Sequence, residues 1–244
     1  MSSPTVFPNP SDTRRSAIAM VDILLVLTVT AIAYVLEDLA IARGWIPFAS
    51  EVRGASSVLA GAASAFALLI IRGGSLADIG LRQPESWARV AFQGFAILIV
   101  FVAAQTLLPL LLSLFINLPA PDMSRYDAIA GNLTGAILFA LVLPLSASIP
   151  EEIIYRGFFM ERMSRIFGSG IEGSSLSVLF QALVFSMIHF QWGIGGMLMT
   201  LIMGIIWGTA FLLCGRNLWV VILAHSGGHI LFVVQLYLAE PLVI

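Results

Sequence analysis

Seven apolar stretches, most of them long enough to cross a bilayer, constrain the fold of this sequence more than any other feature. A transmembrane helix needs about 20 mostly apolar residues, and in lipid a helix can bond all of its own backbone polar groups. The stretches cover about residues 18–36, 55–71, 90–116, 128–149, 176–190, 194–213 and 218–238. They predict an all-α, polytopic transmembrane bundle with about seven or eight spans, in a single transmembrane domain over residues 1–244.

The composition supports a lipid environment and excludes some functions. Of the 244 residues, 11% are charged and 59% are hydrophobic, whereas a soluble domain carries about 25% charged residues. The lipid bilayer is therefore the first expected partner. The formal net charge of −2 gives no reason to expect nucleic acid as a partner. The one cysteine, Cys214, cannot form an internal disulfide and is expected to be a small buried residue.

The arginines predict the orientation, because the sequence contains no lysine. If the loops are numbered alternately from the N-terminus, nine arginines fall on one side and three on the other, namely Arg43, Arg53 and Arg125. An excess of arginine marks the cytoplasmic side. The count therefore predicts an integral membrane protein with its N-terminus in the cytoplasm and Glu240 outside. We also expect its membrane to be the inner (cell) membrane of a bacterium.

The structural role of three further features is not decided by the sequence, and a fourth feature indicates helix packing. The segment Leu76–Arg89 is either an interfacial helix or an ordinary loop, and Glu151–Phe167 either continues the fourth span or lies beside it. Asp22 lies within the first span, and the sequence does not reveal its partner. The pair Gly204 and Gly208 has the spacing of a helix-packing motif.

The main functional signal is a set of ionisable residues inside or beside the apolar stretches. It comprises all three histidines of the chain and a pair of glutamates: His189, His225, His229, Glu151 and Glu152. Each such group costs a few kcal/mol in a bilayer and persists where it pairs with another or lines a wet cavity. This concentration in the C-terminal half indicates a functional site.

The glutamate pair stands in the segment Pro150-Glu-Glu-Ile-Ile-Tyr-Arg-Gly157. Glu152 and Arg156 are four residues apart, so they share a helix face and can form an ion pair. Glu151 points about 100° away and is left free to act on another group. The alternative is purely structural, an N-terminal cap with one salt bridge.

The histidines occur in two separate motifs. His189 ends an apolar run in Phe185-x-x-x-His189, where a lone histidine can simply be a hydrogen-bonded structural residue. His225 and His229 are four apart and share a helix face, so they can chelate a metal or pack through two hydrogen bonds. The zinc-protease helix motif has Glu directly after its first His, and here that residue is Ser226.

Taken in order, these three motifs resemble those of the CPBP family of intramembrane proteases, which comprises the CAAX prenyl endopeptidases and the bacteriocin-processing Abi enzymes. The resemblance covers about residues 130–235, which it marks as a catalytic core. It implies an intramembrane endopeptidase that acts on a membrane-associated peptide or lipopeptide, with prenylated CAAX peptides among the candidates.

The resemblance also implies roles for individual residues. Glu151 and His189 would activate a water, and Glu152 and Arg156 would support that site. A glutamate-dependent mechanism of this kind needs no cofactor.

The last motif, His225 with its partner four residues on, would stabilise the oxyanion. The family usually has Asn where this sequence has His229, and a histidine can also bind a metal. The alternative mechanism therefore uses one divalent metal, with zinc the expected ion and Glu151, His189 and His225 as its ligands.

Two other classes of function remain open. Intramembrane Glu, His and Arg residues also form proton relays, as in a proton-coupled transporter. The chain could also be a non-catalytic membrane scaffold or immunity protein that keeps the cavity without the activity.

Overall fold

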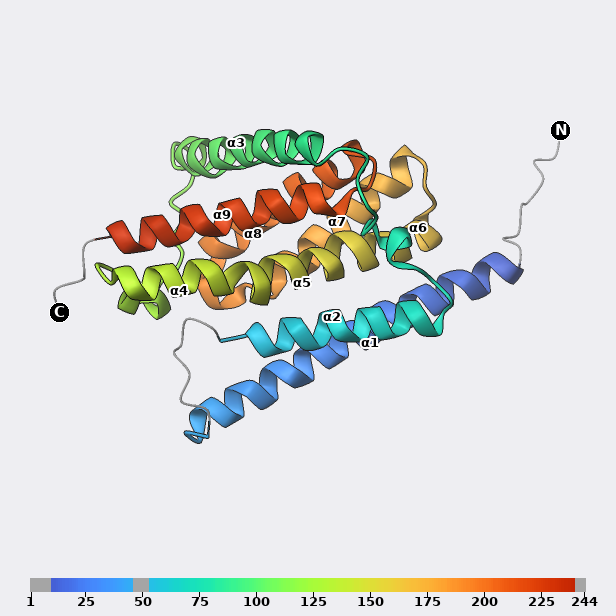
Figure 1. The fold of residues 1–244 in the computed structure, drawn as a ribbon, viewed down its shortest axis with the longest axis horizontal. Coiled ribbons are helices and arrows are strands. Elements are labelled where there is room, and N and C mark those ends of the chain that lie inside the picture. The colour runs from blue at the N-terminus through green and yellow to red at the C-terminus, as the bar shows by residue number, and fades with distance from the viewer. Residues whose placement is uncertain (1–9, 46–52, 240–244) are drawn as a thin grey trace.

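The structure, a computed structural model, describes residues 10–45 and 53–239, and these form a bundle of helices (Figure 1). Glu240, on which the predicted exterior C-terminus rests, lies outside the described residues. The described ranges contain no β-strand. The prediction of an all-α fold is confirmed.

Seven helical segments correspond one to one to the seven apolar stretches. Six are single helices: α1 (Pro10–Ala42), α2 (Ala55–Ile71), α3 (Trp87–Leu112), α7 (Ile171–Met187), α8 (Gly193–Leu213) and α9 (Leu218–Leu238). The remaining one runs continuously over Leu133–Phe167. Five of the segments are long and apolar enough to cross a membrane, and α2 and α7 are shorter apolar helices. A transmembrane helical bundle follows.

The continuous segment is not a uniform α-helix. Its parts are α4 (Leu133–Leu143), η4 (Pro144–Ser148), α5 (Ile149–Glu152), η5 (Ile153–Phe159) and α6 (Met160–Phe167). The parts η4 and η5 have π-helical hydrogen bonding and flank the glutamate pair on both sides. Widened turns of this kind occur often at functional sites. The residues after Glu151 thus continue the fourth span, which decides between the two alternatives.

The helices pack in pairs that are close in the sequence or brought together by the fold. Helix α1 packs along α2, α7 along α8, and α3 along α9, while α4 also lies against α9 (Figure 1). The largest buried cluster joins α1 and α2 to η5, α7, α8 and the start of α9. The segment with the glutamates therefore lies inside the bundle, between the N-terminal pair and the C-terminal helices.

The ends of the helices alternate between the two ends of the bundle. The start of α1, the end of α2, the start of α3 and the helix α6 lie at one end, and α9 finishes at the opposite end (Figure 1). This alternation is the one that the count of arginines assumes. Assignment of the arginine-rich end to the cytoplasm, and of the membrane to a bacterium, stays a prediction.

The segment Leu76–Arg89 is a loop rather than an interfacial helix. It has one short 3-10 turn, η2 (Leu76–Ile79), before α3 begins at Trp87. Gly80 has a φ of +86°, and its carbonyl oxygen accepts a hydrogen bond of 3.1 Å from the backbone N–H of Leu218. The loop thereby anchors the beginning of α9.

Small residues allow helices to approach closely where the sequence predicted it. A Cβ on Gly204 would lie 2.8 Å from the Cα of Ala182, and one on Gly208 would lie 2.6 Å from Nε2 of Gln181. Both contacts are with α7, so the packing role of this pair is confirmed.

Candidate active site

The ionisable residues singled out in the sequence lie on three segments, and all of them except His229 are buried in the bundle. Glu151, Glu152 and Arg156 come from α5 and η5, His189 follows the end of α7, and His225 and His229 come from α9. The exposed fractions are 0% for Glu152 and Arg156, 1% for His225, 6% for Glu151 and 9% for His189. His229 is partly exposed.

Glu152 connects the glutamate segment to α9. Its Oε1 accepts hydrogen bonds from Nη1 of Arg156 at 2.9 Å and from Nδ1 of His225 at 2.7 Å. The ion pair expected from the spacing of four is therefore present. Because an ionised carboxylate can only accept, the proton of the neutral His225 ring sits on Nδ1. Its Nε2 then presents a lone pair.

Glu151 faces the same histidine without bonding to it. Its Oε2 lies 3.8 Å from Nε2 of His225, which is too long for a hydrogen bond. Within the described part of the chain, no side chain or backbone group donates a hydrogen bond to Glu151. This carboxyl group is thus buried beside the ion pair and left free, as the sequence predicted.

His189 has a fixed ring orientation and an open second nitrogen. Its Nδ1 lies 2.7 Å from the carbonyl oxygen of Phe185. A carbonyl can only accept, so Nδ1 carries the proton and Nε2 is left as an acceptor or base. Arg156 and His225 both interact electrostatically with the His189 ring. Among the described residues no direct hydrogen bond joins Glu151 to His189.

Aromatic rings link the three segments around this cluster. The Phe185 ring lies 4.7 Å from the His189 ring and 6.4 Å from the His225 ring, centroid to centroid. The Arg156 guanidinium stands 4.6 Å from the centroid of the Phe185 ring. Trp207, fully buried on α8, lies 5.9 Å from His225. The polar groups are therefore enclosed by apolar walls that limit access of bulk water.

The cluster has more hydrogen-bonding capacity than its own members use. In the described residues, Oε2 of Glu152, Nε and Nη2 of Arg156, and Nε2 of His225 are buried without a partner. Each buried polar atom without a partner costs about 1–3 kcal/mol. Since four of them surround one glutamate pair, the arrangement suits a site that binds a polar guest such as water or a peptide group.

One member of the site was missed by the sequence analysis. The hydroxyl of Ser148 is fully buried and lies 2.7 Å from Nδ1 of His229. The rings of His225 and His229 are 4.5 Å apart, as expected for a shared helix face. A polar residue three positions before Glu151 in an apolar span was the available signal. Ser146 lies in the same run, however, and among the described residues it bonds only to its own helix.

The residues as placed do not fit a metal ion. In the described ranges, no group of three or more His, Cys, Asp or Glu side chains is arranged to hold one. Glu151, His189 and His225, the predicted ligand set, therefore do not form a metal centre in this geometry. The zinc mechanism stays a prediction that a metal analysis would test.

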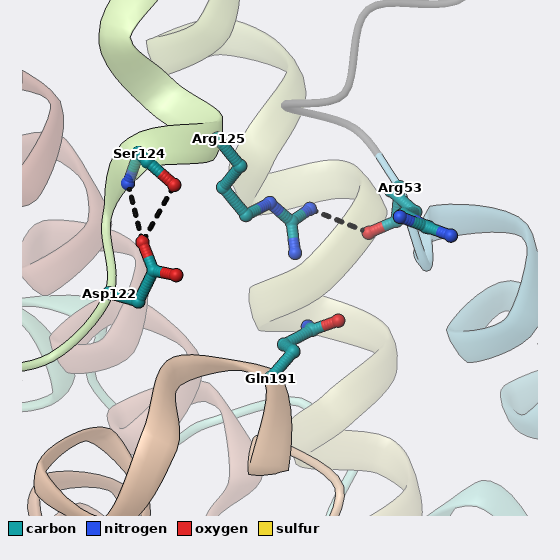
Figure 2. A pocket seen from close by; sticks show the side chains of 5 residues that line it. All are labelled: Arg53, Asp122, Ser124, Arg125 and Gln191. Atoms are coloured by element: carbon teal, nitrogen blue, oxygen red, sulfur yellow. Dashed lines mark hydrogen bonds between the residues drawn. The ribbon is translucent and has the colours of Figure 1, made fainter.

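A polar cavity of about 180 Å³ lies beside the turn that follows His189. Figure 2 shows Arg53, Asp122, Ser124, Arg125 and Gln191 around it. Asp122 accepts hydrogen bonds from the hydroxyl of Ser124 at 2.7 Å and from its backbone N–H at 3.0 Å, which lower the pKa of Asp122. The carboxylate is therefore ionised at neutral pH, and the arginines and Asp122 leave the cavity with mixed charge.

A second buried ionic cluster lies where α2 ends and α6 passes, and it contains the partners of Asp22. The Asp22 carboxylate is fully buried and accepts from Arg72 at 2.8 Å and from Nε of Arg162 at 3.0 Å. Arg162 also pairs with Glu161, which accepts from Arg165 at 2.7 Å. This network ties α1 to the end of α2 and to α6.

Comparison with known proteins bears on the segment that holds these residues. Residues 133–231 match the family model of the type II CAAX prenyl endopeptidase Rce1-like. No curated protein and no solved structure matches the chain. The matched range includes every predicted site residue and lies within the predicted core of residues 130–235. Over residues 133–231 the chain is therefore similar to the type II CAAX prenyl endopeptidases of the Rce1-like family, a similarity that supports an intramembrane endopeptidase as its general class.

Proposed function

We propose that this protein hydrolyses a peptide bond of a membrane-associated peptide or lipopeptide by means of a water activated by Glu151 and His189. The observation that carries the proposal is the free, buried carboxyl group of Glu151 beside the bonded set of Glu152, Arg156 and His225. A carboxyl group without a partner inside a membrane bundle is costly. A role as general base accounts for its presence.

In this mechanism the water loses a proton as its oxygen attacks the carbonyl carbon of the scissile bond. Glu151 accepts the proton, and the Nε2 lone pair of His189 orients the water or shares that role. The tetrahedral intermediate then collapses, the C–N bond breaks, and the proton passes to the leaving amine. Glu152 holds His225 in place, and Arg156 holds Glu152.

The oxyanion of the intermediate needs a donor. With its proton on Nδ1 and bonded to Glu152, neutral His225 has no hydrogen on Nε2 to give. His229, whose ring is partly exposed beside it, is the better placed donor of the pair. We therefore assign the oxyanion chiefly to His229 and the support of the site to His225.

The test is cleavage by the purified, detergent-solubilised or reconstituted protein. Candidate substrates are a farnesylated CAAX peptide, its non-prenylated counterpart and a bacteriocin leader peptide, with products identified by mass spectrometry in H₂¹⁸O. We expect one ¹⁸O atom in the new carboxyl terminus, and we expect Glu151→Ala and His189→Ala each to abolish cleavage while the protein still folds and inserts. Full activity in either variant would refute the assignment.

The same preparation distinguishes the metal-dependent mechanism. We expect activity to persist after dialysis against a strong chelator and expect metal analysis to find less than one equivalent of zinc. Stoichiometric zinc together with loss of activity on chelation would support the alternative ligand set of Glu151, His189 and His225. The control for the site variants is Ser146→Ala, since among the described residues the Ser146 hydroxyl bonds only to the carbonyl of Val142 in its own helix.

A further inference from the structure

His229 occupies the position at which the resemblance to the CPBP family leads one to expect Asn. The exchange changes the chemistry of hydrogen bonding. An amide NH₂ group always has hydrogens to donate, whereas a neutral imidazole carries its one ring N–H on either Nδ1 or Nε2. If His229 is to donate from the nitrogen that faces a substrate, something must hold its proton there.

Ser148 is placed to do this. Its side chain is fully buried, and its Oγ lies 2.7 Å from Nδ1 of His229. Ser148 ends the π-helical part η4, three residues before Glu151, so the contact joins the glutamate segment to α9. His229 Nε2 has no hydrogen bond to any described residue and is not among the buried unpaired atoms.

The burial of Ser148 decides the direction of this hydrogen bond. Nδ1 of His229 is the partner that the described residues offer to the Ser148 hydroxyl. If Nδ1–H donated to the hydroxyl, the buried hydroxyl hydrogen would be left without an acceptor, which is unfavourable. If the hydroxyl donates to the Nδ1 lone pair, both groups are satisfied. The second arrangement puts the ring proton on Nε2.

We propose that Ser148 is a positioning residue that holds His229 in its Nε2–H form, so that this ring donates a hydrogen bond to the oxyanion as the amide of Asn would. The proposal rests on the proposed peptidase function.

Under it the three histidines of the protein differ. His189 and His225 bond to acceptors through Nδ1 and present a lone pair at Nε2, whereas His229 bonds to a donor and presents a hydrogen. The site thereby contains neutral imidazole rings that accept a hydrogen bond, those of His189 and His225, and one that donates a hydrogen bond, that of His229.

The first test is Ser148→Ala, with Ser146→Ala as the matched control two residues away on the same segment. Removing one oxyanion donor typically costs about 100-fold to 1,000-fold in kcat. Because part of the His229 population would keep the useful tautomer, we expect Ser148→Ala to lower kcat about tenfold or more with little change in KM. Ser146→Ala should leave both constants unchanged.

The second test replaces His229 by Asn, whose side-chain amide has no tautomers. In the His229→Asn background the side-chain amide donates without help, so Ser148→Ala should change kcat less than about twofold there. Equal losses in the two backgrounds would show that Ser148 acts only through packing and would overturn the proposal. Glu151→Gln is assayed in parallel, because its failure to inactivate the enzyme would instead refute the proposed function.

A third measurement reads the tautomers directly in the protein that keeps Ser148. The chain has three histidines, so ¹⁵N-histidine labelling gives few enough signals to assign by single His→Gln variants. We expect the Nε2–H tautomer for His229 and the Nδ1–H tautomer for His189 and His225. An Nδ1–H form of His229 would overturn the proposal even if the kinetics were as expected.

Discussion

Two buried clusters in this protein both pair carboxylates with arginine, and they differ in how completely their polar atoms are hydrogen-bonded. Around Asp22, both carboxylate oxygens accept from arginines, and Nη2 of Arg162 is the one buried atom of the network without a partner in the described chain. Around Glu152, four buried atoms lack partners, and the neighbouring Glu151 accepts no hydrogen bond there.

This difference in hydrogen bonding indicates that the Asp22 cluster stabilises the fold and that the cluster around Glu152 serves the function. A buried ion pair contributes to a fold when its remaining hydrogen bonds are satisfied, and removing one partner is strongly destabilising. A cluster with spare donors and acceptors gives up stability and keeps the capacity to bind a polar guest. We therefore expect substitutions at the Asp22 cluster to change stability and those at the Glu151 cluster to change catalysis.

The largest expected effect is that of Glu151→Gln on catalysis. The substitution keeps the shape and removes the base, so kcat/KM should fall by at least about 1,000-fold. Because Glu151 accepts no hydrogen bond from the described residues, the Tm in detergent should fall little or rise. If Glu151→Gln lowered Tm as much as an Asp22 variant does and left activity unchanged, the Glu151 cluster would also be structural, and the proposed difference between the two clusters would be wrong.

Asp22→Asn is the matched carboxylate-to-amide change in the structural cluster. It removes the charge of Asp22 from the fully buried Arg162, which then pairs only with the partly exposed Glu161 among the described residues, and breaking a buried pair costs up to about 3–5 kcal/mol. We expect that loss in the free energy of unfolding, measured by SDS titration in mixed micelles, with kcat/KM of the folded fraction within about twofold of the parent. Asp38→Asn, which breaks a half-exposed pair with Arg53, is the control and should change little.

Arg156→Lys tests the geometry of the catalytic cluster more finely. Lysine keeps the positive charge beside Glu152 but loses the planar group that stands over the Phe185 ring. Since Phe185 also supplies the carbonyl that orients His189, we expect kcat to fall about tenfold, with KM nearly unchanged. A parent-like kcat would mean that only the charge of Arg156 matters to the site.

The sequence predicted the elements of the fold well, because each depends on local properties. Apolar stretches 55–71 and 218–238 coincide with α2 and α9, and hydrophobicity over about 20 residues is a local signal. The spacing of four between Glu152 and Arg156 predicted their ion pair for the same reason. The shared helix face likewise placed the rings of His225 and His229 together.

What the sequence did not predict depends on contacts between distant segments or on departures from the regular helix. Asp22 and Arg162 are 140 residues apart, and Ser148 and His229 are 81 apart, so no periodicity reveals either contact. The π-helical turns around Glu151 shift the faces on which side chains lie. The tautomers of the histidines follow from those contacts and cannot be inferred from the sequence.

The smallest expected effect is that of Arg72→Met, at the rim of the structural cluster. The Arg72 side chain is 36% exposed, and Arg162 remains to neutralise Asp22 when it is removed. We expect a fall in Tm less than half of that caused by Asp22→Asn, and a smaller effect at high salt, because an exposed partner is screened. If the two variants lowered Tm equally, Arg72 would be as important for neutralising Asp22 as Arg162 is. The stability of the network would then depend on the partly exposed Arg72–Asp22 pair and not on the buried Arg162–Asp22 pair alone.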